Sequence, residues 1–198
     1  MRLTAGVRPL VKQRDDPLSP LAIAVGVAAL VAPGLHSITD VLEWYQGGFS
    51  IGQLWLNYVA FLPMPWLLLG LYVVREPRTN AFGLVGALLY GVAFTYFAHT
   101  TLYALAERVP TYEALWSSLG GLYTVHGAFM VLGGLMFAWS ALRAGWLPKW
   151  PLLLFASGVG FNLVIALAPV PDIFQTIGST ARNVGLMAMG YAILFKRL

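Results

Sequence analysis

Apolar residues run along this chain in six long stretches, each separated from the next by a short polar break. The breaks contain charged residues, proline or glycine, in the sequences EWYQGG, REPRTN, ERVPTYE, RAGWLPKW and PVPD. A helix that crosses a bilayer needs about 20 predominantly apolar residues. The pattern therefore predicts six transmembrane helices, over residues 20–39, 51–74, 80–106, 114–142, 151–171 and 175–195.

Two features inside these stretches predict how the helices are shaped and packed. The first stretch carries a stripe of small residues, Ala22, Gly26, Ala29 and Pro33, and such stripes let helix backbones approach closely in lipid. The second contains Pro-Met-Pro at 63–65. Because neither proline donates a backbone hydrogen bond and each crowds the carbonyl four residues earlier, this helix is predicted to kink or break.

Composition agrees with a membrane protein and excludes several functional classes. Of the 198 residues, 59% are apolar and only 10% are charged, whereas a soluble chain has roughly 25% charged residues. The absence of cysteine excludes disulfides, thiolate metal sites, iron–sulfur clusters and thiol nucleophiles. The sequence lacks the basic stripe of a nucleic-acid binder, so nucleic acid is excluded as a partner. The lipid bilayer is the predicted partner.

The distribution of basic residues predicts the orientation of the helices. If the N-terminus is cytoplasmic, ten of the twelve Lys and Arg residues fall on the inner side, and Arg108 and Arg182 fall on the outer side. Cytoplasmic segments carry the excess of Lys and Arg in membrane proteins. We therefore expect a multi-pass protein of the plasma (inner) membrane with both termini cytoplasmic. The ten inner residues are Arg2, Arg8, Lys12, Arg14, Arg75, Arg78, Arg143, Lys149, Lys196 and Arg197.

The pattern divides the chain into two parts. Residues 1–19 lack the apolar core of a signal peptide and are rich in Lys and Arg, so they are predicted to be a basic cytoplasmic tail. Residues 20–198 are predicted to form a single domain. Its fold class is all-α, a polytopic bundle of six transmembrane helices with the N-terminus and the C-terminus inside.

The candidate chemistry lies in the half of the bundle that is predicted to face outward. All three histidines, His36, His99 and His126, fall there. An imidazole in lipid must hydrogen-bond, face a cavity or hold a ligand, since an unpaired polar group there costs several kcal/mol. Other polar residues share a helix face with them or fall at a similar depth. The predicted ligand-binding residues are His36, Asp40, Asn57, Tyr96, His99, Tyr103, Tyr123, His126, Arg182 and Asn183.

Three interpretations of these residues stay open. In the first, His36, His99 and His126 are metal ligands, or His99 and His126 are axial ligands, so the cofactor is a divalent metal ion or haem b. In the second, the site binds a hydrophobic small molecule, and Arg182 anchors its carboxylate, propionate or phosphate group. In the third, the protein is a structural membrane subunit without a site, whose polar residues satisfy one another.

Two further functions depend on resemblance to known families. The stretch GALLYGVAFTYFAHTT (86–101) resembles the Gly/Tyr-rich helix of the emopamil-binding sterol isomerase family, which places an acid near the position of His99. That resemblance implies an enzyme acting on a lipid or isoprenoid substrate. Six spans, inward termini and an outer polar site are similar to the vitamin-capturing S-components of energy-coupling factor transporters, which implies a substrate-capture subunit.

The sequence does not decide between an enzyme, a transporter subunit and a membrane subunit of a larger assembly or homo-oligomer. One observation bears on the transporter class. The predicted spans contain no Asp or Glu at mid-depth, which argues against a carrier driven by protons or sodium ions through an intramembrane carboxylate.

Overall fold

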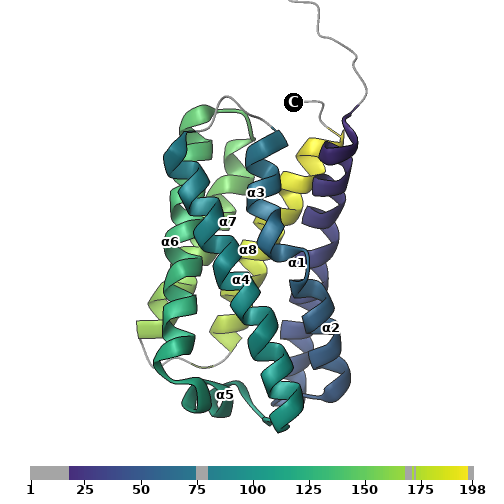
Figure 1. Ribbon diagram of the computed structural model, residues 1–198, viewed down its shortest axis with the longest axis vertical. Helices are drawn as coiled ribbons and strands as arrows, with labels where there is room; N and C mark the ends of the chain where they lie inside the picture. Colours follow the sequence, from purple (N-terminus) through teal and green to yellow (C-terminus); the bar gives the residue numbers. More distant parts are fainter. Residues whose placement is uncertain (1–17, 75–79, 168–170, 172, 196–198) are drawn as a thin grey trace, which may run out of the picture.

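The protein folds as an elongated bundle whose long helices run side by side (Figure 1). The structure is a computed structural model that describes residues 18–74, 80–167, 171 and 173–195, and these residues contain no strand. The all-α prediction is confirmed for them, whereas the predicted tail over 1–19 lies almost wholly outside them. The helices are α1 (Pro20–Gln46), α2 (Ile51–Phe61), α3 (Met64–Val74), α4 (Ala81–Glu107), α5 (Tyr112–Leu119), α6 (Gly121–Ala144), α7 (Lys149–Leu167) and α8 (Ile173–Phe195).

The two ends of the bundle differ, and the short helix α5 marks one of them (Figure 1). We call this the α5 end. It also holds the C-terminal ends of α1 and α4 and the N-terminal ends of α2, α6 and α8. The loop after α1 is tied to the loop before α5 there, because the Phe49 amide donates a hydrogen bond of 2.8 Å to the Pro110 carbonyl. The opposite end holds the junction of α6 and α7.

Helix length and hydropathy support a membrane-spanning chain. Within α7, Lys149–Ile165 form a shorter apolar segment. Large apolar side chains such as Val31 and Leu132 are exposed on the outside of the bundle, as expected in lipid. The chain is therefore a multi-pass helical membrane protein in contact with a bilayer. Among the residues that the structure describes, four stretches are long and apolar enough to cross it: Pro20–Gln46, Ile51–Val74, Ala81–Glu107 and Gly121–Ala144.

The first helix is longer than predicted, and this moves an acid into the bundle. The sequence pattern ends the predicted span at residue 39, which leaves Asp40 outside it. In the structure α1 continues to Gln46, because Gly47 takes the left-handed conformation (φ 68°) and its amide bonds the Trp44 carbonyl. A glycine in this conformation is the usual helix stop. Asp40 therefore lies on α1, packed against its neighbours.

The predicted proline break is confirmed. α2 ends at Phe61 and α3 begins at Met64, so the second apolar stretch is two helices rather than one. The break brings the carbonyl of Pro65 against α4. A Cβ on Gly91 would lie only 2.5 Å from that carbonyl oxygen, so the absence of a side chain at this position lets α3 pack closely on α4.

The predicted fourth span, 114–142, is wrong at its start. It divides at Gly120, whose φ of 54° lies in the left-handed region that glycine adopts readily. The residues before Gly120 form α5, which lies across the end of the bundle, and α6 begins at Gly121 (Figure 1). The boundary was missed because Gly120 lies between two apolar segments, where a glycine is equally consistent with close helix packing.

Glycines bring two pairs of long helices into backbone contact. Between α4 and α6, a Cβ on Gly133 would lie 2.6 Å from the Gly86 carbonyl oxygen. Between α1 and α8, a Cβ on Gly190 would lie 2.7 Å from the Cβ of Ala29. Small residues permit such approach where lipid supplies no hydrophobic drive for association. The predicted stripe of α1 is buried on this side, at Ala22, Gly26, Ala29 and Pro33.

Candidate functional site

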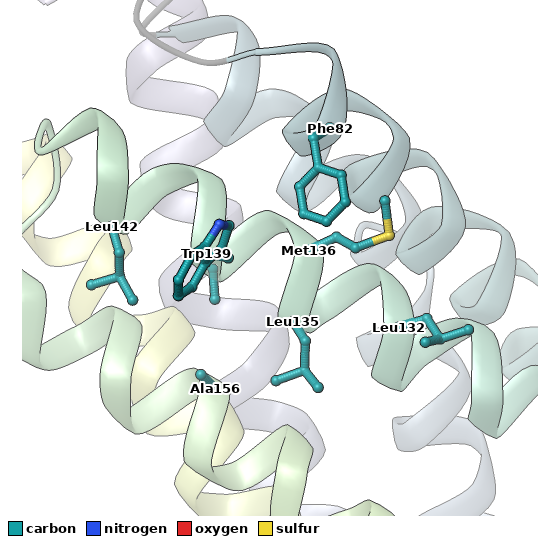
Figure 2. A pocket seen from close by; sticks show the side chains of 8 residues that line it. Phe82, Leu132, Leu135, Met136, Trp139, Leu142 and Ala156 are labelled. Atoms are coloured by element: carbon teal, nitrogen blue, oxygen red, sulfur yellow. The ribbon is translucent and has the colours of Figure 1, made fainter.

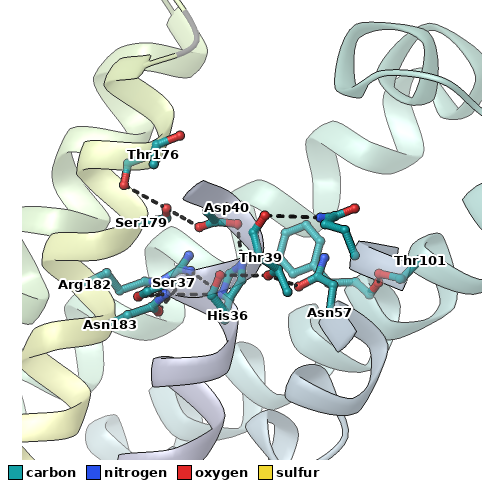
Figure 3. Close-up of polar contacts among 12 residues, drawn as sticks. His36, Ser37, Thr39, Asp40, Asn57, Thr101, Thr176, Ser179, Arg182 and Asn183 are labelled. Atoms are coloured by element: carbon teal, nitrogen blue, oxygen red, sulfur yellow. Dashed lines mark hydrogen bonds and ion pairs between the residues drawn. The ribbon is translucent and has the colours of Figure 1, made fainter. Parts of the chain in front are cut away.

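A cluster of polar side chains lies between α1 and α8, toward the α5 end (Figure 3). We call it the polar centre and define it by five residues: His36, Asp40, Ser179, Arg182 and Asn183. Each helix presents its members at spacings of three and four residues, which places them on one helix face. The close contact at Gly190 brings these faces together, so the polar centre is largely removed from the surroundings.

The contacts of His36 indicate which of its two ring nitrogens carries the proton. Its Nδ1 lies 3.2 Å from Arg182 Nη2 and 3.4 Å from Asn183 Nδ2. Guanidinium and amide nitrogens only donate hydrogen bonds, so Nδ1 must accept and the ring proton lies on Nε2. Nε2 then donates to Asp40 Oδ1 across 3.1 Å. A neutral imidazole therefore bridges a cation on α8 and an anion on α1.

Arg182 is the most unusual group of the polar centre. It is only 3% exposed, so its side chain does not extend to the outer surface. Its guanidinium donates to Asn183 Oδ1 from Nε and Nη2, at 3.3 and 3.2 Å, and Nη1 lies 3.0 Å from Met130 Sδ. The guanidinium carbon also lies 5.5 Å from the centre of the Phe94 ring. Among the residues that the structure describes, no carboxylate pairs with it directly.

A buried charge surrounded by neutral partners is costly. Removing an ion from water costs several kcal/mol, which is recovered only when an opposite charge and good hydrogen bonds replace the water. Asp40 supplies the opposite charge only through His36, and a thioether is a weak acceptor. The Nη1 side of Arg182 is therefore the part of the site with unused capacity for an anion.

Asp40 is held by both helices. It accepts from His36 within α1 and from the Ser179 hydroxyl of α8. Asn183 extends the network to Ser37, with 3.1 Å between Asn183 Nδ2 and Ser37 Oγ. The sequence reasoning did not single out Ser37 or Ser179. Serines in helices commonly bond their own backbone, so nothing in their spacing distinguished them.

The predicted site residue Asn57 belongs to a neighbouring group between α1 and α2. Asn57 Oδ1 lies 3.1 Å from the Thr39 hydroxyl, which also lies 2.8 Å from the His36 carbonyl. Gln53 Nε2 lies 3.4 Å from the Thr39 carbonyl, and Gln53 Oε1 is buried without a partner. This group fixes α2 against α1 directly beside the polar centre. Sequence reasoning identified Asn57 and missed Thr39 and Gln53.

His126 lies in a different environment, among aromatic rings of α4 and α6. It has 0% exposure, and neither of its ring nitrogens has a hydrogen-bond partner. Its ring stacks on that of Tyr96 with 3.9 Å between centroids. Tyr90, which the sequence reasoning did not select, is also fully buried with an unpartnered hydroxyl. Its ring lies 4.7 Å from that of Phe94, the residue that Arg182 also faces.

The remaining predicted tyrosines lie toward the α5 end. Tyr123 is buried, and its ring lies 5.5 Å from Tyr112 and 5.7 Å from Trp116 of α5. Burial raises the pKa of the Tyr112 phenol, because the charged form loses its hydration there. Tyr103 is half-buried on α4. These rings close the bundle beneath α5, and none belongs to the polar centre.

The three histidines do not form one site. His36 lies in the polar centre, His126 lies among the aromatic rings, and His99 is exposed on α4. In the described part of the chain, no group of three or more His, Asp or Glu side chains is arranged to hold a metal ion. The predicted ligand set of His36, His99 and His126 is therefore not assembled, and no observation on these residues supports haem or metal binding. Sequence depth alone grouped His36, which lies between α1 and α8, with His99 and His126 of α4 and α6.

Comparisons of the chain with protein-family models, with curated proteins and with solved structures find no match. The two family resemblances drawn from the sequence stay predictions. The function therefore has to be inferred from the chemistry of the site.

Proposed function

We propose that the chain crosses the bilayer six times, with both termini cytoplasmic and the α5 end outside. The sixth crossing is α8, whose 23 residues span about 35 Å at 1.5 Å per residue, against a hydrocarbon core of about 30 Å. Its Arg182 and Asn183 face inward, while Val184, Tyr191 and Phe195 are exposed. This arrangement, with polar residues inside and apolar residues outside, suits a helix surrounded by lipid. The ten-to-two distribution of basic residues supports the orientation.

We further propose that the protein binds a lipid-soluble small molecule with an acidic head group. The observation that carries this proposal is the buried Arg182 guanidinium, whose Nη1 faces only the sulfur of Met130. A carboxylate or phosphate accepts charge-assisted hydrogen bonds from guanidinium far more strongly than a thioether does. The head group of the ligand takes the place of the Met130 sulfur.

Two other buried polar groups support this location for the head group of the ligand. The Tyr90 hydroxyl and the His126 imidazole are buried and have no partners, although most buried polar atoms have at least one. Tyr90 contacts Phe94, which Arg182 also faces, and His126 lies one turn before Met130 on α6. Both groups therefore lie close to the position at which the head group would sit. The aromatic rings of α4 supply an apolar wall for the rest of the ligand.

Solvent extraction of the purified protein followed by mass spectrometry tests the proposal. Wild type is expected to carry a lipid-soluble acid in near-stoichiometric amount, and Arg182→Gln is expected to lose at least nine-tenths of it. Arg108→Gln, which removes an exposed arginine at the same end of the bundle, is the matched control and should retain the ligand. The comparison is made between variants with wild-type gel-filtration profiles. Equal amounts of the acid in wild type and Arg182→Gln would contradict the proposal.

A proton-coupled carrier is the second candidate, because α1 continues past Asp40. The sequence pattern argues against this class because no Asp or Glu falls at mid-depth in a predicted span. In the structure Asp40 lies on α1 toward the α5 end, in contact with His36 and Ser179. Carboxylate and histidine chains of this kind form proton relays in membrane carriers. A pH-sensitive dye inside proteoliposomes would detect ligand-dependent proton movement that Asp40→Asn abolishes, and its absence in wild type leaves simple binding as the function.

A further inference from the structure

A second candidate site lies on the outside of the bundle, far from the polar centre. It is an apolar groove of about 500 Å³ along α6, flanked by the start of α4 and by α7 (Figure 2). Leu132, Leu135, Trp139 and Leu142 of α6 form its length, Phe82 forms one side and Ala156 forms the other. Its walls expose almost no polar atoms, so the groove fits a hydrocarbon chain and no polar ligand.

The length and position of the groove identify the kind of hydrocarbon. From Leu132 to Leu142 it follows ten residues of helix, about 15 Å at 1.5 Å per residue. That is half the thickness of a hydrocarbon core of about 30 Å, and therefore the depth of one leaflet. The groove ends where α6 ends, at the end of the bundle opposite α5. An acyl chain of a lipid in that leaflet would fill it from the mouth to the bilayer midplane.

The charges at the mouth of the groove identify the head group. Arg143 follows Leu142 directly, is exposed, and lies with its guanidinium carbon 5.2 Å from the centre of the Trp139 ring. Lys149, also exposed, begins α7 at the same end. The acids that the structure describes, namely Asp40, Glu43, Glu107 and Glu113, all lie toward the α5 end. In the described residues the mouth therefore carries only positive charge, which complements an anionic phosphate.

We propose that this groove binds one acyl chain of an anionic phospholipid, with the phosphate group held at Arg143 and Lys149. Trp139 contributes to both parts of the lipid, because its ring lines the groove and supports the Arg143 guanidinium by a cation–π contact. Basic residues at the end of a groove between transmembrane helices are suited to anionic lipid head groups. The site is independent of the ligand proposed for Arg182.

Native mass spectrometry of the detergent-solubilised protein, titrated with phosphatidylglycerol or phosphatidylcholine of identical chains, tests the proposal. Wild type is expected to bind the first phosphatidylglycerol at least fivefold more tightly than phosphatidylcholine. The double variant Arg143→Gln/Lys149→Gln should lose this preference, while Arg108→Gln at the α5 end should retain it. Equal affinity of wild type for the two lipids, or a preference that survives in the double variant, would overturn the proposal.

A second pair of variants tests the groove itself. Ala156→Phe fills the groove and is expected to reduce binding of both lipids at least fivefold. Ala128→Phe, at an exposed position of α6 outside the groove, should leave lipid binding unchanged. Unaltered lipid binding in Ala156→Phe, with gel filtration showing a native profile, contradicts the groove as the site. The groove proposal is also contradicted if wild type forms lipid-free dimers that phosphatidylglycerol does not dissociate. In that case a second copy of the chain covers the groove.

Discussion

The α4–α6 and α1–α8 helix pairs both pack closely, but through different kinds of contact. Between α4 and α6 the contacts are backbone to backbone at Gly133 and ring to ring at His126. Between α1 and α8 a glycine contact is followed by a network of hydrogen bonds centred on His36. The α4–α6 pair is held by glycine contacts, ring contacts and a neutral hydrogen bond from Ser140 Oγ to Asn80 Oδ1, so close association in lipid does not require buried charges. The charges of Arg182 and Asp40 are therefore not required for packing, which agrees with the proposal that this part of the bundle binds a ligand.

Disrupting the hydrogen-bond network between α1 and α8 is expected to have the largest effect on stability. His36→Leu removes the common partner of the buried Arg182 and the half-buried Asp40, and losing one member of a buried charge network costs about 3–5 kcal/mol. The measurement is the free energy of unfolding in mixed micelles. The triple variant His36→Leu/Asp40→Leu/Arg182→Met removes all the charges together and should recover most of the loss. If the triple variant is as unstable as His36→Leu, the cost arises from packing and not from stranded charge.

Disrupting the glycine contact between α4 and α6 is expected to have the second largest effect on stability. Gly133→Ala places a Cβ 2.6 Å from the backbone of α4 at Gly86 and Tyr90, where no side chain can move aside. Overpacking of this kind costs about 1–3 kcal/mol, and the unfolding temperature should fall accordingly. Gly127→Ala on the same helix is the matched control, because nothing lies within 4 Å of the added Cβ. An equal loss in both variants would show that α6 does not depend on close approach at Gly133.

An effect of similar size and opposite sign is expected at His126. His126→Phe keeps a ring against Tyr96 and removes two buried nitrogens that have no partner. Relieving an unsatisfied buried group of this kind is worth about 1–3 kcal/mol, so the variant should unfold at a higher temperature than wild type. If His126 contacts the proposed ligand, the same variant should also retain less of the co-purifying acid. A lower unfolding temperature would show that the imidazole has a stabilising partner.

His99 should have the smallest effect. It is exposed on α4, and substitutions at exposed positions usually change stability by less than about 0.5 kcal/mol. His99→Ala is therefore expected to keep the unfolding temperature and the bound ligand of wild type. A loss of ligand in His99→Ala equal to that in Arg182→Gln would return His99 to the site and contradict the division of the histidines described above.

The positions of the helices follow from the sequence, because the cost of placing polar backbone and charge in lipid acts on each segment separately. Long apolar runs predict the extents of α4 and α8 to within two residues. The missing amide donors of Pro63 and Pro65 break the second helix whatever surrounds them. The ends of α1 and α6 were less accurate, because glycine either ends a helix or packs inside one. Gly47 and Gly120 end helices, whereas Gly133 packs inside one.

The partners of each polar residue were decided only by the tertiary structure. Spacing places His36 with Asp40 on one face, and Ser179 with Arg182 and Asn183 on another, but it does not show that these faces meet. In water, the apolar face of a helix indicates which side is buried. In lipid, both sides of a helix such as α4 are apolar, so the sequence could not distinguish the exposed His99 from the buried Tyr90. That difference depends on where neighbouring backbones approach, which glycine contacts far apart in the sequence determine.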